Sequence, residues 1–142
     1  MGGISAGKLV NLRRLADDRG RFKMMAIDQR DSLRRALSSA LGKTPEAVSY
    51  DDLARTKETI TRSLAPLATA VLMDPVYGFQ RSVAHIPGRV GILLAMEETG
   101  YQQAGAGGKE RKSRLVEGLS VAKAKRAGAN AVKLLLYYNP QA

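Results

Sequence analysis

Four stretches of the chain are almost continuously apolar, and each is short enough to be a strand. They are "FKMMAIDQR" at 22–30, "TAVLMDPVYG" at 69–78, "RVGILLAMEETG" at 89–100 and "NAVKLLLYYNP" at 130–140. These runs lack the strict alternation of a sheet with one face in water, and they are typical of parallel strands covered on both faces. We therefore predict four buried parallel strands.

Apolar residues recur at helical spacing between these runs. The spacing predicts helices over 5–16, 30–41, about 49–66 and 109–128. Ser49 followed by Asp52 is a capping-box signature for the start of the third helix, and Gly128 suits the end of the fourth. Strand and helix alternate along the chain, which indicates a parallel α/β fold.

The 142 residues are consistent with one domain over 1–142 that begins with a helical region in 1–20. The segment "QQAGAGGK" at 102–109 is rich in glycine, and we interpret it as a flexible loop within that domain. The connection between the second and third strands is short for a parallel crossover, so its helix is expected to be minimal.

Charge and composition narrow the class of protein. The net charge of +10 invites a nucleic-acid partner, but the basic residues are spread along the chain and the aromatic content is only 5%. The distribution therefore favours general attraction for small anions over nucleic-acid binding. The chain has no cysteine, no signal-peptide core and no apolar run long enough to cross a bilayer, which predicts a cytoplasmic protein with no membrane partner.

An ionisable residue lies at the end of three of the predicted strands and within the fourth. These residues are Asp28, Asp74, Glu97 and Lys133. Parallel α/β folds place their chemistry at the carboxyl ends of the strands. By strand alternation each of the four shares a face with small residues. We therefore expect the four side chains to converge on one cleft.

Each of these residues also has a simpler explanation. Either Asp28 or Asp74 could cap a turn, and "DPVYG" after the second strand has turn composition. Lys133 could extend its ammonium to the surface, although burial among Val132 and "LLLYY" favours a carboxylate or anion partner.

Other chemical motifs are weak. "GGISAGKL" matches the spacing of a phosphate-binding loop, but Leu9 replaces the hydroxyl residue and no strand precedes it. His85 is the only histidine, and a loop or packing role suits it better than catalysis. No metal site is expected from these residues.

Four ordered blocks resemble one enzyme family. "MMAIDQRDSLRRAL", "VLMDPVYG", "GILLAMEETGY" and "AVKLLLYYNP" are similar to successive N-terminal blocks of the tagatose-1,6-bisphosphate aldolases, with the sulfofructosephosphate aldolases as more distant relatives. The resemblance implies a (β/α)₈ barrel and a class I aldolase that uses neither metal nor cofactor. Such an enzyme cleaves a ketose bisphosphate into dihydroxyacetone phosphate and glyceraldehyde 3-phosphate through a lysine Schiff base.

The resemblance also assigns roles to residues. Asp28 and Gln29 match an active-site pair after the first strand, and Lys133 matches an active-site lysine that does not form the Schiff base. On this basis Asp28 and Lys133 are predicted to be catalytic. Gln29 from the resemblance, together with Asp74 and Glu97 from the predicted cleft, is expected to bind a phosphorylated sugar.

The chain is short for this architecture, since about 250 residues make a typical barrel. The sequence therefore predicts a half-barrel of about four βα units, with the Schiff-base lysine on a later strand. Such a chain would be inactive alone and would pair with a C-terminal half or with another copy. The alternative is a basic, non-catalytic half-barrel that assembles with another chain or binds nucleic acid.

Overall fold

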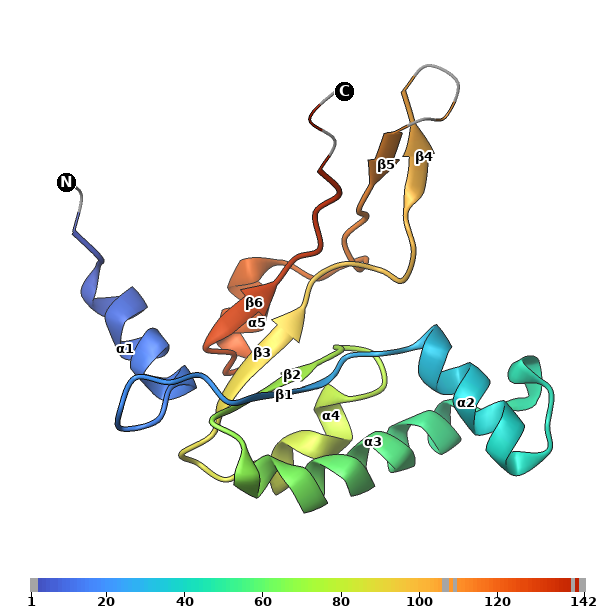
Figure 1. Ribbon diagram of the computed structural model, residues 1–142, viewed down its shortest axis with the longest axis horizontal. Coiled ribbons are helices and arrows are strands. Elements are labelled where there is room, and N and C mark those ends of the chain that lie inside the picture. Colours follow the sequence, from blue (N-terminus) through green and yellow to red (C-terminus); the bar gives the residue numbers. More distant parts are fainter. Residues whose placement is uncertain (1–2, 106–107, 109, 139, 141–142) are drawn as a thin grey trace.

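A four-stranded parallel sheet forms the centre of the computed structural model, which describes residues 3–105, 108, 110–138 and 140 (Figure 1). Its strand order is β1-β2-β3-β6, the order in which these strands occur along the chain. The strands are β1 (Met24–Ile27), β2 (Ala70–Met73), β3 (Gly91–Ala95) and β6 (Ala131–Lys133). This confirms the predicted parallel α/β fold, in which each new strand is added to the same side of the sheet, as in the first half of a (β/α)₈ barrel.

Helices cover one face of the sheet. They are α3 (Tyr50–Leu64), α4 (Phe79–Ser82) and α5 (Val121–Arg126), whose Ile60, Phe79 and Ala124 pack in the core. The register row Ile27, Met73 and Leu94 is buried in the core beneath them. Helix α2 (Asp31–Leu41) packs against α3, and short 3₁₀ turns lie at Pro45–Ala47, Ala65–Leu67 and Val83–His85. Within the described part of the chain, no helix combines the length and apolar character needed to cross a bilayer.

The opposite face of the sheet is more open. The row Ala26, Leu72, Leu93 and Ala131 runs across all four strands, and none of these residues is fully buried. In a closed barrel this face lines the interior, where small and branched side chains fill the space. The residues that follow β6 are also apolar and exposed, with Leu136 72% and Tyr138 87% accessible.

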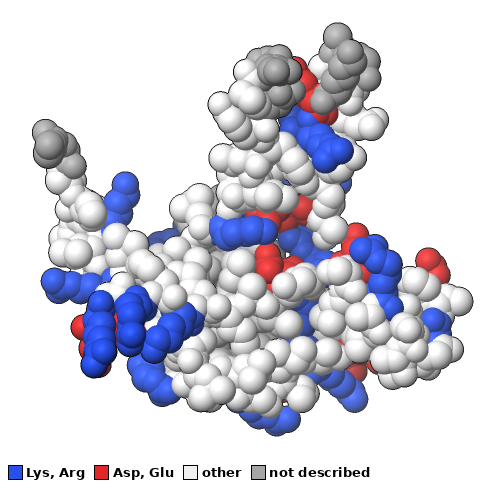
Figure 2. Space-filling model, viewed as in Figure 1, with Lys and Arg blue, Asp and Glu red and all other residues white. Residues whose placement is uncertain are grey.

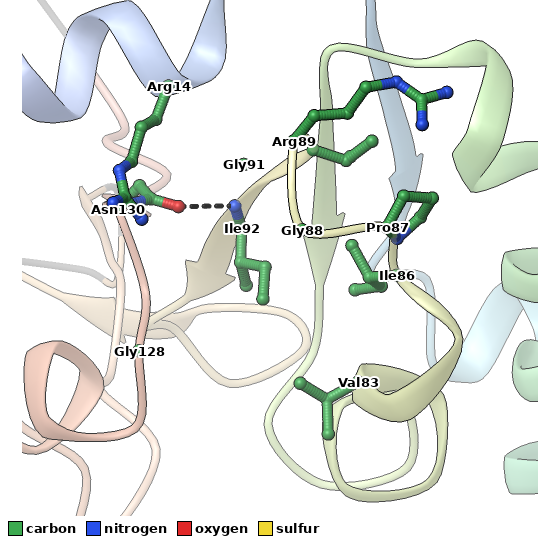
Figure 3. Close-up of a pocket in the computed structure, with 11 residues that line it drawn as sticks. Arg14, Val83, Ile86, Pro87, Gly88, Arg89, Gly91, Ile92, Gly128 and Asn130 are labelled. Carbon is green, nitrogen blue, oxygen red and sulfur yellow. Dashed lines mark hydrogen bonds between the residues drawn. The ribbon is translucent and has the colours of Figure 1, made fainter.

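Helix α1 (Ala6–Leu15) packs at the amino ends of the strands. Its contact with β3 is close, because a Cβ atom built on Gly91 would lie 2.7 Å from the Arg14 carbonyl oxygen and 2.7 Å from Leu15 Cδ2. Figure 3 shows Arg14 of α1 and Asn130 lining one cavity, and Asn130 Oδ1 accepts a hydrogen bond of 3.0 Å from the Ile92 backbone N–H. Gly91 is therefore needed for the close approach of α1 to the sheet.

Replacing Gly91 by alanine is expected to destabilise the chain by about 1–3 kcal/mol, the usual cost of overpacking. The added methyl group meets backbone on one side, so α1 must move. Urea unfolding measures the loss, and faster amide exchange in α1 would show where it acts. Gly88→Ala is the matched control, because no heavy atom lies within 4 Å of its built Cβ. Equal stability of the two variants would contradict this account.

The segment between β3 and β6 differs from the prediction. Gln102–Ala104 and Glu110–Lys112 form an antiparallel hairpin, β4 and β5, that projects from the carboxyl end of the sheet (Figure 1). The helix predicted over 109–128 is therefore wrong in its first half, and among its described residues, 110–128, only Val121–Arg126 is helical. The loop predicted over 102–109 begins as strand β4, and residues 106, 107 and 109 of it lie outside the described residues.

The last predicted strand is also shorter than expected. Pairing with β3 ends at Lys133, and Leu134–Tyr138 follow without regular structure. This segment lies beside the hairpin, since the Ser113 hydroxyl donates to the Leu135 carbonyl and the Tyr101 and Tyr137 rings meet edge to face at 5.5 Å. Residue 139 of the predicted strand is not among the described residues.

Candidate active site

A cavity of about 340 Å³ lies at the carboxyl end of the sheet. It is bordered by the β1–α2 connection, the start of α2, the segment after β3 and the end of β6. Its lining residues include Asp28, Gln29, Arg30, Glu97, Gly100 and Lys133. The strands therefore bring together residues that are 105 positions apart in the sequence, as parallel strands with aligned carboxyl ends do.

Lys133 is held between two carboxylates in this cavity. Its Nζ lies 3.1 Å from Asp28 Oδ2 and also donates a hydrogen bond to Glu97 Oε1. The carboxylates are more buried than the ammonium, since their side chains are 15% and 7% exposed and that of Lys133 is 34% exposed. Of the two alternatives for this lysine, pairing with carboxylates is the one observed.

The two carboxylates determine the charge state of Lys133. Burial by itself lowers the pKa of this lysine, but the hydrogen bonds and negative charges of Glu97 and Asp28 outweigh it and raise the pKa above its ordinary value of 10.5. Lys133 is therefore a permanently charged ammonium at neutral pH. An amine in that state has no free electron pair and is a poor nucleophile.

The raised pKa of Lys133 predicts how stability depends on pH. Its contribution to the free energy of unfolding should be fully present below pH 10.5, the pKa expected in the unfolded chain. It should be lost as the pH rises through the higher folded-state pKa. The measurement is the difference in unfolding free energy between the native chain and Lys133→Met, taken below and above pH 10.5. A difference that grows with pH would contradict the prediction.

Glu97 is fixed by the backbone around it as well as by Lys133. Its Oε2 accepts a hydrogen bond of 3.3 Å from the Leu135 backbone N–H, and the Arg30 guanidinium donates to the Glu97 carbonyl oxygen. Arg30 comes from the segment after β1 and Leu135 from the segment after β6. Glu97 therefore links three of the four strand ends, and its carboxylate is rigid because both of its oxygens are engaged.

Asp74 does not join this group, and the predicted convergence is wrong for this residue. Its side chain is fully buried outside the cavity lining. Oδ1 accepts hydrogen bonds from the backbone N–H groups of Val76 at 2.9 Å and Tyr77 at 2.7 Å, so this carboxylate caps the turn after β2. The prediction failed because the backbone turns directly after β2, so that the N–H groups of Val76 and Tyr77 bind the Asp74 carboxylate.

Asp74 instead pairs with a lysine that the sequence interpretation did not identify. Lys57 of α3 is also fully buried, and its Nζ lies 2.7 Å from Asp74 Oδ2. The same ammonium donates to the backbone carbonyl oxygens of Ile27 and Gln29, each at 2.6 Å. Burial lowers the pKa of Lys57, and the adjacent negative charge of Asp74 offsets this only in part. The sequence feature that could have identified Lys57 is its spacing, because a charged residue four positions after Leu53 falls on the buried face of α3.

The remaining candidate chemistry lies elsewhere. His85 Nε2 lies 3.0 Å from Glu58 Oε1, and this contact joins the turn after α4 to α3. Neither residue lines the cavity that contains Lys133. A second cavity of about 240 Å³ opens at the amino end of β3 and is lined in part by Arg14 and Asn130 (Figure 3). Across the described residues, no group of three or more carboxylate or histidine side chains is arranged to hold a metal ion.

The charge lining the cavity is mixed. Acidic side chains come from Asp28, Asp31, Glu97 and Glu98, and basic ones from Arg30, Arg35 and Lys133. Figure 2 shows acidic (red) and basic (blue) side chains side by side at the base of the projecting part of the molecule, which contains the β4–β5 hairpin in Figure 1. Such a site offers both hydrogen-bond acceptors and donors to hydroxyl groups, which distinguishes it from a purely basic anion-binding site.

Comparisons with known proteins point to one family. The profile described as DeoC/LacD family aldolase matches residues 22–142. The chain is 36% identical over 137 residues to the tagatose 1,6-diphosphate aldolase of Listeria monocytogenes serovar 1/2a, an alignment that covers 96% of this chain and 38% of the relative. It is 38% identical over 139 residues to tagatose 1,6-diphosphate aldolase 1 of Enterococcus faecalis, covering 96% of this chain and 39% of that relative. The chain therefore spans less than two fifths of the length of these curated relatives.

Proposed function

The chain belongs to the DeoC/LacD family of aldolases, and from that premise we propose that it supplies one side of the active site of a class I ketose-bisphosphate aldolase. The observation that carries the proposal is the group Asp28–Lys133–Glu97 at the carboxyl end of the sheet. A carboxylate, an ammonium and a second carboxylate lie there within hydrogen-bonding distance, in a cavity open enough to admit a small polar substrate.

We propose a ketose 1,6-bisphosphate such as tagatose 1,6-bisphosphate as the substrate, in keeping with the names of the relatives. The mixed lining suits the hydroxyl-bearing middle of a sugar, with Gln29 and Glu97 among the residues that bind it. The phosphate groups would be held largely by residues outside this cavity. The general basic surplus of the chain attracts such an anion.

The proposed reaction divides the chemistry between two lysines. An uncharged lysine from a further part of the barrel, outside these 142 residues, condenses with the substrate ketone and releases water. A carboxylate removes the proton of the C4 hydroxyl, and the C3–C4 bond breaks. The electron pair of that bond passes to the iminium to give an enamine. The aldehyde phosphate then leaves. Protonation and hydrolysis of the enamine release dihydroxyacetone phosphate and restore the amine.

Within this scheme Lys133 acts as a fixed positive charge. An ammonium close to the reactive amine disfavours protonation of that amine and so lowers its pKa, which activates it as a nucleophile. Asp28 and Glu97 keep Lys133 charged and in place. Lys133 contacts Oδ2 of Asp28, and we propose the other oxygen of this carboxylate, Oδ1, as the base that removes the C4 hydroxyl proton.

The proposal is tested by joining residues 1–142 to the remaining part of the Listeria monocytogenes relative and assaying cleavage of tagatose 1,6-bisphosphate. Borohydride is added in the presence of dihydroxyacetone phosphate to reduce any Schiff base, and the modified lysine is located by mass spectrometry. We expect cleavage by the joined protein and an adduct outside residues 1–142. An adduct on Lys133 would assign the nucleophile to this chain and overturn the division of roles.

The two edge strands of the sheet are candidate surfaces for a partner. The sheet has β1 and β6 as its edges, and apolar side chains are exposed beside both of them, including Phe22, Met24 and Leu134. We propose that these edges pair with a complementary half-barrel, either a C-terminal half or a second copy of this chain. Light scattering of the isolated chain should show association, whereas a monomer at all concentrations would count against it.

A further inference from the structure

Lys57 holds the backbone on both sides of Asp28. Its Nζ donates to the carbonyl oxygen of Ile27 and to that of Gln29, the residues that directly precede and follow Asp28, with both distances at 2.6 Å. Strand β1 ends at Ile27, so the Asp28 segment lies beyond the sheet ladder. Lys57 replaces the missing ladder contacts at this point of the chain.

The ammonium is itself fixed on its other side. Its third contact is Asp74 Oδ2 at 2.7 Å, and Asp74 is held in turn by the backbone N–H groups of Val76 and Tyr77. Two of the three ammonium donors serve the Ile27 and Gln29 carbonyl oxygens, and the contact with Asp74 Oδ2 is an ion pair without hydrogen-bond geometry. Helix α3, the turn after β2 and the end of β1 therefore meet at one buried atom. With its side chain fully buried, Lys57 has no direct access to a substrate.

The surroundings leave little freedom for this arrangement to shift. A Cβ atom built on Gly78 would lie 3.0 Å from Asp74 Oδ2 and 3.5 Å from Lys57 Cδ, so only glycine fits there without displacing the pair. The position on α3 belongs to the buried stripe of Leu53 and Thr61, where an aliphatic side chain would be the ordinary choice. A buried ion pair contributes little to stability compared with well-packed apolar residues. The presence of the Lys57–Asp74 pair is explained if Lys57 positions the backbone around Asp28.

We propose that Lys57 is a positioning residue for the site: through the two carbonyl groups that flank Asp28, it fixes the carboxylate of Asp28 against Lys133. It acts through Asp28 and touches neither the substrate nor the reacting atoms. The catalytic meaning of this role rests on the proposed aldolase function. The coupling from Lys57 to Asp28 to Lys133 can be measured in the chain without any aldolase activity.

The test follows the titration of Lys133 in the 142-residue chain labelled with ¹³C-lysine. The Cε resonance of Lys133 is identified by its absence in Lys133→Met. The main variant is the pair Lys57→Met with Asp74→Asn. This pair removes one positive and one negative charge, so the direct electrostatic effect on Lys133 largely cancels. The amide that replaces the Asp74 carboxylate retains an oxygen for the N–H groups of Val76 and Tyr77, and no unpaired charge is left buried.

We expect the Lys133 titration to move to lower pH in this double variant, because Asp28 is no longer held against the ammonium. Asp28→Asn should cause a downward shift of its own. When the double variant is made in the Asp28→Asn background, no further shift is expected, because Lys57 acts through Asp28. Lys43→Met is the matched control, since Lys43 forms an exposed ion pair with Asp52 and should leave Lys133 unchanged.

Two results would overturn the proposal. One is an unchanged Lys133 titration in the folded double variant, with native amide shifts in α3 and β1. The other is a full additional shift in the Asp28→Asn background, which would show that Lys57 and Asp74 affect Lys133 by another route. Neither result depends on the aldolase assay with the joined protein. Failure of that assay with a positive titration result would leave Lys57 as the positioning residue of a site with other chemistry.

Discussion

Lys57→Met alone is expected to lower the free energy of unfolding by about 3–5 kcal/mol, the usual cost of removing one partner of a buried ion pair. The change leaves the Asp74 carboxylate fully buried without a counter-charge. It also removes the donor from the carbonyl oxygens of Ile27 and Gln29. Urea unfolding followed by circular dichroism measures the loss. Since small domains are stable by about 5–15 kcal/mol, this substitution takes a large share of the total.

Two comparisons separate the buried charge from a general loss of packing. Adding Asp74→Asn to Lys57→Met should recover much of the loss, because no ionised group then remains buried. Lys43→Met removes an ion pair whose side chains are 44% and 31% exposed, and it should cost no more than about 1 kcal/mol. A loss for Lys57→Met as small as that for Lys43→Met would show that the buried pair is not a structural requirement.

The sheet was predictable because its strands carry the strongest local pattern in the chain. Residues such as Val71 and Leu94 lie in near-continuous apolar runs, and both are fully buried in the core. The pairing of Lys133 with Asp28 was also predictable, since a lysine inside an apolar strand requires a partner and parallel strands end at one edge. The capping box at Ser49 and Asp52 was correct for the same local reason.

The parts that sequence reasoning missed depend on contacts between distant positions. Lys57 finds its acceptors at Ile27 and Gln29, 30 and 28 residues earlier, and local spacing cannot reveal that. The charged segment at 109–114 fits an exposed helix equally well, and only its pairing with Gln102–Ala104 makes part of it a strand. Gly105, with φ of +73°, supplies the turn that the hairpin needs.

Asp74 illustrates the limit of alternation as a guide to function. Both Asp28 and Asp74 follow a buried strand, and the pattern treats them alike. They differ because the backbone after β2 turns immediately, so that Val76 and Tyr77 present their N–H groups to Asp74. The segment after β1 instead runs on into α2, and the Asp28 carboxylate stays free to meet Lys133.

Lys133→Met is expected to lower the rate of ketose bisphosphate cleavage by about 10²–10³-fold in the joined protein, the scale set by losing one preorganised charge at a reacting centre. The physical reason is that the reactive amine, without a neighbouring ammonium, regains its proton at neutral pH. The loss should appear mainly in kcat, since Lys133 is already engaged by Asp28 and Glu97 before substrate binds. Lys125→Met, at a surface position beside Asn11 of α1, is the matched control.

The pH dependence decides between this role and a purely structural one. If Lys133 lowers the pKa of the reactive amine, the rate of Lys133→Met should recover as the pH rises, because the rising limb of its profile, which reports deprotonation of that amine, is displaced to higher pH. Lys133→Arg keeps the positive charge and should retain more activity with an unshifted profile. A uniform loss at every pH would mean that Lys133 only holds Asp28 and Glu97 in position. The carboxylates would then be the catalytic part of the cluster, and the ammonium their support.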